Sequence, residues 1–180
     1  GNQAAINRVA LMLRSSDAAI REMAADALDQ INWTSRSLEE SGFYYRAKEE
    51  WGALIDLGEH AFPVLVSTLR DSNRLTREAA IGVLQHLNWD PSGAKPEDQA
   101  YYYVAQEEWS KVAQIGDAAT PALAQALEEG DLLTRRTISK LLGDLDTPNS
   151  LKLLTKLTKD SDEIVRNYAA NAARRISNGP

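Results

Sequence analysis

The sequence predicts an all-α fold, a right-handed superhelix of about four stacked repeats and ten helices. A recurring segment carries this prediction: AAIREMAADALDQINW at 18–33, RLTREAAIGVLQHLNW at 74–89, LLTRRTISKLLGDL at 132–145 and, more loosely, EIVRNYAANAARRI at 163–176. Aligned on Arg21, Arg77, Arg135 and Arg166, the copies lie 56, 58 and 31 residues apart, a self-similarity typical of repeat architectures. No strand-like alternation of apolar and polar residues occurs, and Ala and Leu dominate the periodic segments.

The first repeat opens with a helix over 4–14, because Ile6, Val9, Ala10 and Leu13 have helical spacing. We call this the A helix, and we call the helix formed by each recurring segment the B helix, the first over 18–32. Each B helix is preceded by a residue whose side chain can accept the free N–H groups of its first turn. These residues stand four positions before each aligned arginine: Asp17, Asn73, Asp131 and Asp162.

The first two repeats contain a third segment, which we call the C helix, over 37–58 and 95–116. Ser37 and Glu40 have the spacing of a capping box, and Pro96 suits a first helical turn. Gly58 and Gly116 end these helices, since glycine readily adopts the positive φ of a C-terminal cap.

The remaining elements follow the same order. Pro63 and Pro121 fall in the first turns of the next A helices, where proline is tolerated. The last repeat is a plain pair of helices, and 177–180 should be frayed. We therefore predict one domain over 1–180, with repeats at about 4–58, 59–116, 117–146 and 147–177.

Composition limits the function. The chain has 20 Lys and Arg against 26 Asp and Glu, a net charge of −6, which argues against broad binding to nucleic acid or to an anionic membrane. It contains no cysteine, so disulfides and thiolate metal sites are excluded and the cytoplasm is the expected compartment. No apolar run is long enough for a membrane helix. Gly1 reads as a tag remnant, and the immediate start of the first repeat suggests a piece of a longer protein.

The sequence resembles HEAT repeats of the short type named after phycobilisome lyases. The resemblance lies in a Pro-x-Leu in the A helix and an Asp-x-x-x-Arg followed by Ala and Leu in the B helix: Pro121, Leu123, Leu127, Asp131, Arg135 and Leu142, then Asp162, Arg166, Ala169 and Ala170. It implies a HEAT- or armadillo-like α-solenoid that serves as an interaction scaffold. The C helix departs from the short two-helix unit.

The aligned arginines indicate a structural ladder. Each lies one turn inside a B helix, within reach of an acidic turn residue such as Asp71, Glu129 or Asp160, to which arginine donates a forked pair of hydrogen bonds. The alternative is a row of residues that binds a ligand.

Aromatic residues cluster in the two C helices: Phe43, Tyr44, Tyr45 and Trp51, then Tyr101, Tyr102, Tyr103 and Trp109. Tyr44 and Trp51 are seven residues apart, so in one continuous helix their rings share a face and pack against Trp33 and the A helix. We interpret the cluster as core, with a docking surface as the alternative.

The exposed side of the B helices is the candidate partner-binding face. Assigning Leu75, Ala79, Val83, Leu84 and Leu87 to the interior leaves the opposite stripe of each B helix outside, and concave faces are where solenoids bind. The stripe runs from acidic to basic along the chain, and its alternative is a solvated helix surface. The candidate residues are Glu22, Asp26, Asp29, Glu78, His86, Arg136, Lys140, Asn167, Asn171 and Arg174.

No catalytic, cofactor-binding or metal-binding constellation emerges. His60 and His86 lack a nucleophile or acid at motif spacing, and two scattered imidazoles do not make a metal site. The adjacent pairs Glu49-Glu50 and Glu107-Glu108 point in different directions on a helix.

Three functions stay open. The favoured one is a non-enzymatic scaffold that binds a partner protein through the B helices. The resemblance also implies a bilin lyase or lyase-like chaperone of phycobilisomes, and a HEAT-like DNA-binding protein is the third, for which only a few basic residues are available. The partner's identity and the oligomeric state are not fixed by the sequence.

Overall fold

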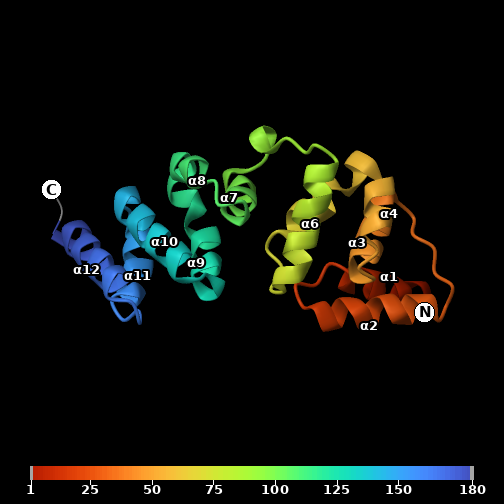
Figure 1. The fold of residues 1–180 in the computed structure, drawn as a ribbon. Helices are drawn as coiled ribbons and strands as arrows, with labels where there is room; N and C mark the ends of the chain where they lie inside the picture. Colours follow the sequence, from red (N-terminus) through yellow and green to blue (C-terminus); the bar gives the residue numbers. More distant parts are fainter. Residues whose placement is uncertain (1, 179–180) are drawn as a thin grey trace. The chain divides into compact units, whose positions relative to one another are not determined.

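The computed structural model describes residues 2–178, which form twelve α-helices and three 3-10 turns and contain no strand (Figure 1). The predicted all-α fold is therefore confirmed. The chain divides into two compact units, Gly1–Pro91 and Ser92–Pro180, which are described separately. The interpretation of Gly1 and the fraying expected at 179–180 lie outside the described residues, and the grouping of all repeats into one domain stays a prediction.

Unit 1 begins with a helical hairpin, α1 (Asn2–Met12) and α2 (Ala18–Asp29). The elements that follow are α3 (Leu38–Ala47), α4 (Trp51–Asp56), α5 (Phe62–Thr68) and α6 (Arg74–His86). Helices α1 and α2 pack together, α3 packs on α2, and α4 packs on α6. Leu13, Leu28 and Phe43 lie in the core between α1, α2 and α3.

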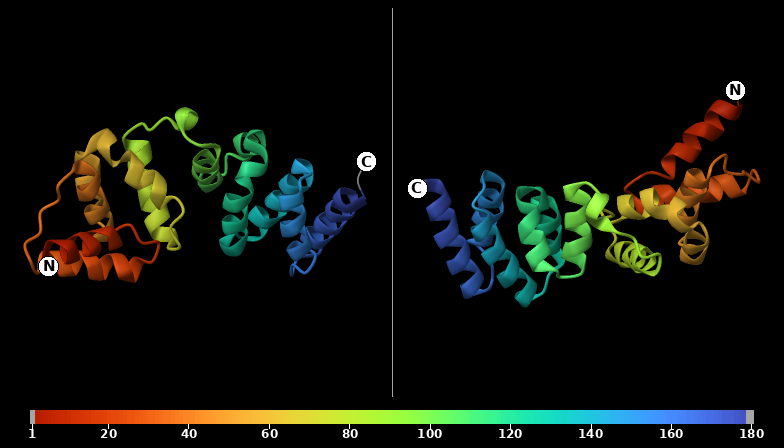
Figure 2. Two further views of the ribbon diagram at one scale, coloured as in Figure 1. Left: turned by 180° about the vertical axis from the view of Figure 1, so that it is seen from behind. Right: turned by 90° about the horizontal axis from the view of Figure 1, so that it is seen from above.

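Unit 2 consists of α7 (Pro96–Ala105), α8 (Trp109–Ile115), α9 (Thr120–Glu129), α10 (Leu132–Leu145), α11 (Pro148–Leu157) and α12 (Glu163–Asn178). Helix α12 packs against both α11 and α10, and Figure 2 shows this blue group from two further directions. One continuous core runs through the unit, and Leu123, Leu142 and Leu154 are fully buried in it.

Each predicted C helix is two helices, so residues 2–178 form twelve helices where the sequence indicates about ten. Helices α3 and α7 end where Glu49 and Glu107 adopt a φ of 56°. The next residue, Glu50 or Glu108, donates its N–H to the carbonyl of Tyr45 or Tyr103 at 2.9 and 3.0 Å. This is the Schellman arrangement that ends a helix, and it normally favours glycine at the position that glutamate fills here. No glycine marked the break in the sequence, which is why the periodicity alone missed it.

The other helix ends follow the predictions closely. Gly58 and Gly116 have positive φ, and the side chains of Asp17, Asn73, Asp131 and Asp162 accept backbone N–H groups at the starts of their B helices. The capping box is only half formed, because Ser37 accepts the N–H of Glu40 whereas the Glu40 carboxylate binds Arg36 instead. Helix α12 continues to Asn178, so 177–178 are helical rather than frayed.

Candidate functional site

The four aligned arginines hold the turns that precede their own helices. Each uses one guanidinium nitrogen to donate to backbone carbonyl oxygens five or six residues earlier in the chain. The acceptors are Ser15 and Ser16 for Arg21, Asp71 and Ser72 for Arg77, Gly130 for Arg135, and Asp160 and Ser161 for Arg166. The repeated sequence therefore encodes a repeated turn, because the same side chain closes it each time.

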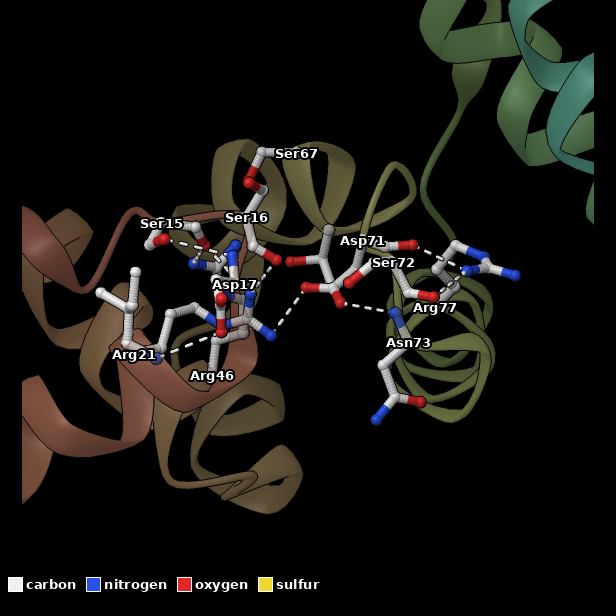
Figure 3. Close-up of polar contacts among 12 residues, drawn as sticks. Ser15, Ser16, Asp17, Arg21, Arg46, Ser67, Asp71, Ser72, Asn73 and Arg77 are labelled. Atoms are coloured by element: carbon white, nitrogen blue, oxygen red, sulfur yellow. Dashed lines mark hydrogen bonds and ion pairs between the residues drawn. The ribbon is translucent and has the colours of Figure 1, made fainter.

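Two of the arginines also form the predicted rungs between repeats. Arg21 pairs with Asp71 at 2.7 Å, and Arg135 pairs with Asp160 at 2.9 Å. In each case the carboxylate lies in the turn before the next B helix, as Figure 3 shows for Asp71. The first pair is buried, with 3% and 1% of the side chains exposed, and the second is partly buried. These contacts support the structural ladder over the ligand-binding row.

Arg46 is a buried cation that the repeat pattern did not predict. It lies beside Arg21 and Asp71 and donates to the carbonyl oxygen of Leu13 at 2.6 Å (Figure 3). Burial lowers its pKa to about 10, and the charge of Arg21 acts in the same direction. The second C segment has Val104 at the equivalent position, so comparing the repeats gave no signal.

The aromatic residues of the C segments are core or half-buried, as predicted. Phe43 and Tyr102 are buried, and the other six are partly covered. The Trp33 and Tyr44 rings lie 5.9 Å apart, which confirms the expected contact between them. The argument from two helical turns fails for Tyr44 and Trp51, however, because the helix break separates them.

The structure leaves nine of the ten candidate face residues exposed, on α2 and α6 of unit 1 and on α10 and α12 of unit 2; Arg136 is partly buried. Four of them have partners within the protein. Asp26 and Asp29 both bind Lys48 at the end of α3, Glu78 pairs with Arg74, and Arg136 pairs with Asp162. Three of these side chains join different elements and Glu78 pairs within α6, so all four are already engaged and are poor choices for testing a binding surface.

The other six candidates make no side-chain hydrogen bond or ion pair with the described part of the chain: Glu22, His86, Lys140, Asn167, Asn171 and Arg174. Their polar groups face solvent and remain available to a partner. Whether the candidates of the two units form one acidic-to-basic stripe stays a prediction.

A polar network fixes the acidic end of the candidate face. The Tyr44 hydroxyl donates to the Asp29 carboxylate, which also accepts from Lys48 at 3.0 Å. The hydrogen bond to Asp29 is the main reason that the pKa of Tyr44 rises to about 12, and it lowers the pKa of Asp29. Asp29 therefore ties α2 to α3.

The assignment of Leu75 to the interior was wrong, since 72% of its surface is exposed. Leu133 and Ile164 stand at the same repeat position, two residues before the aligned arginine, and are 71% and 44% exposed. This position lies three residues before Glu78, Arg136 and Asn167, so it continues the candidate stripe toward the amino end of each helix. Alignment of the copies shows the recurrence in three of the four, since the first has Ala19 at this position, but only burial shows that these residues point outward.

The Arg136–Asp162 pair makes a testable prediction about pH. The hydrogen bond from Arg136 is the largest of the influences that lower the pKa of Asp162 to about 2. A lowered pKa means that the contribution of the pair to stability is present above pH 3.8, the ordinary value, and is lost as pH falls toward 2. In a carboxyl NMR titration, Arg136→Gln should raise the pKa of Asp162, whereas Lys140→Gln, one turn further along α10, should leave it unchanged. An equal effect of both variants would show that the general charge of the helix, and not the pair, sets this pKa.

Among residues 2–178 no three His, Asp or Glu side chains gather as they would around a metal ion. None of the helices in that range is long and apolar enough to cross a membrane.

The helical hairpins and their arginine-closed turns define an α-helical repeat protein. Comparison with known families agrees: residues 103–174 match the family model of HEAT repeats. No curated protein and no solved structure matches the chain.

Proposed function

We propose that the chain is a non-enzymatic module that binds another protein through the exposed face of its B helices. HEAT repeats typically mediate interactions between proteins, and solenoid repeats use continuous faces of this kind for binding. The class of protein thus favours a partner protein, and the exposed side chains of the B helices indicate the surface that binds it.

One observation carries the proposal: Leu75, Leu133 and Ile164 are exposed at the same repeat position. A single exposed leucine on a protein surface is ordinary. Exposed aliphatic residues that recur at the same repeat position are unusual, because nothing in the packing of these helices requires an apolar side chain there. An aliphatic residue beside solvated polar groups is the composition of a binding surface with an apolar centre and a polar rim.

The experiment uses α10, where Leu133 and Lys140 lie on the stripe. The partner is captured with the wild-type chain, identified and purified, and its Kd is measured by calorimetry. The variant Leu133→Asp with Lys140→Glu should weaken binding more than tenfold, because it places charges where an apolar contact and a cation were. The control is Lys152→Glu with Lys156→Glu on α11, which changes exposed residues off the stripe and should leave Kd within about twofold.

Both variants should keep the melting temperature of the wild type, since all four positions are exposed. Unchanged binding by the α10 variant would rule out this surface, and so would equal weakening by the α11 control.

The finer family resemblance is also part of the proposal. We infer that 147–177, a two-helix unit with Asp162, Arg166 and Ala169 at the quoted positions, is a repeat of the phycobilisome-lyase type. A non-enzymatic module should produce no coloured adduct when incubated with phycocyanobilin and an apo-phycobiliprotein. Formation of a coloured adduct would show that the protein acts as a bilin lyase and would contradict the scaffold function.

A further inference from the structure

The two C segments repeat one arrangement of a tyrosine and a glutamate. The turn that ends α3 places the backbone nitrogen of Glu50 2.9 Å from the carbonyl oxygen of Tyr45, to which it donates. The turn that ends α7 does the same for Glu108 and Tyr103, at 3.0 Å. The pair in unit 1 and the pair in unit 2 therefore start from the same backbone geometry.

The tyrosine rings are also oriented alike in the two segments. The rings of Tyr44 and Tyr45 have centroids 5.8 Å apart and planes inclined at 68°. The rings of Tyr102 and Tyr103 have centroids 5.8 Å apart and planes inclined at 63°. The Tyr45 ring is therefore set on α3 much as the Tyr103 ring is set on α7.

The two carboxylates act on equivalent tyrosines. The pKa of Tyr44 is raised mainly by its hydrogen bond to Asp29, and the charge of Glu50 adds to the increase. The pKa of Tyr102 is raised mainly by burial, and the charge of Glu108 adds to that increase. Because the influence of a charge falls off quickly with distance in salt solution, each carboxylate lies close to its own pair of tyrosines.

In unit 2 a lysine of the same chain fills this arrangement. The Nζ atom of Lys111 on α8 lies 4.7 Å from the centroid of the Tyr103 ring and 2.5 Å from a carboxylate oxygen of Glu108. The face of a tyrosine ring attracts an ammonium group, and a carboxylate adds a charge-assisted hydrogen bond. The pKa of Lys111 is raised, first by its hydrogen bond to Glu108, so the arrangement favours the charged lysine.

In unit 1 the corresponding lysine is missing. Ala53 stands where unit 2 has Lys111. Within residues 2–178 no lysine or arginine pairs with Glu50 or lies over the Tyr45 ring; Glu50 is exposed and Tyr45 is partly exposed. A Cβ atom added to Gly52 would have no other atom within 4 Å, so the start of α4 is open to an approaching group.

We propose that Tyr45 and Glu50 bind the ammonium group of a lysine side chain from another protein. The ligand is a cation because the ring face and the carboxylate both attract positive charge. It is a lysine because Lys111 shows how a lysine fills the same arrangement in unit 2. Lys48, at the end of α3, is engaged by two aspartates of α2. The site lies on the C segment, so it does not depend on the proposed role of the B helices.

An NMR titration of the full chain with a tetralysine peptide tests the site. The ring protons of Tyr45 should shift, whereas the same peptide with acetylated lysine side chains should leave them unchanged because it carries no ammonium groups there. Glu50→Gln should raise the Kd at least fivefold. The control is Glu59→Gln, which removes another exposed carboxylate of unit 1 and should change the Kd less than twofold.

Exchanging the residues by which the two segments differ tests the same idea within the chain. Ala53→Lys supplies the lysine internally and should abolish the response of Tyr45 to the peptide. Ala53→Gln, which adds length without charge, should retain it. Lys111→Ala should empty the arrangement in unit 2, so that the ring protons of Tyr103 gain a response to the peptide that the wild type lacks.

Circular dichroism should show that each variant retains the wild-type fold. A wild type whose Tyr45 resonances do not respond to tetralysine overturns the proposal, as does an equal effect of Glu50→Gln and Glu59→Gln. The variant Leu133→Asp with Lys140→Glu separates this inference from the proposed function, since it should weaken partner binding through the B helices and leave the Tyr45 response unchanged.

Discussion

Replacing Asp71 by Asn is expected to lower the free energy of unfolding by about 3–5 kcal/mol. The substitution keeps the size of the side chain but removes the negative charge that pairs with Arg21 at 2.7 Å, in a pair with almost no exposure. Arg46, itself only 4% exposed, also loses the carboxylate that favours its charged form. Urea denaturation followed by circular dichroism measures the loss.

Asp160→Asn is the matched control for this prediction. Asp71 and Asp160 occupy the same repeat position, and each accepts the N–H of the residue two positions later, at 2.9 and 2.8 Å. Each also pairs with the arginine of the preceding repeat, but Arg135 is 23% exposed where Arg21 is 3%. Solvent screens the more exposed pair, so the control should lose clearly less stability. Equal losses would show that the turn, and not the buried ion pair, carries the effect.

Leu142→Ala is expected to cost about 2–5 kcal/mol, the range for truncating a buried leucine. Leu142 is fully buried in the core of unit 2 with Leu154 and Ala169. Its equivalents Leu28 and Leu84 are also buried, so three copies of the repeat place leucine at this position. The same urea experiment checks the value.

Leu133→Ala is the corresponding control, the same change on the same helix. Leu133 is 71% exposed, so its truncation removes little contact and should alter stability by less than about 0.5 kcal/mol. If the two variants lost the same stability, the assignment of these leucines to the inside and the outside of α10 would be wrong.

Sequence reasoning succeeded where an element is stabilised by its own neighbours in the chain. The N-caps at Asp17 and Asn73 and the positive φ of Gly58 depend on hydrogen bonds and sterics within a few residues. The two arginine rungs were predicted too, because the acidic turn residues Asp71 and Asp160 stand six positions before the aligned arginines Arg77 and Arg166.

Sequence reasoning failed where the burial or pairing of a side chain depends on which other helices pack over it. Leu75 fits an apolar helical period, yet no neighbouring helix covers the amino end of that stripe. Arg46 lies on a helix whose pattern gives no sign of burial, and the hairpin of α1 and α2 supplies its acceptor, the carbonyl of Leu13. The same holds for the candidate face. Asp26 and Lys140 occupy the same repeat position, five residues after the aligned arginine, but only in the folded chain does Lys48 lie within reach of Asp26.

By itself the sequence determined that this protein is all helical, that its hairpins repeat, and where most helices begin, because capping and periodicity are local. Only the tertiary structure decided that the C segments break at Glu49 and Glu107, since those glutamates adopt positive φ without the glycine that marks such a break. It also decided which charged residues are engaged within the fold and which apolar residues are left uncovered. Those properties depend on the helices that pack alongside, which lie far away in the chain.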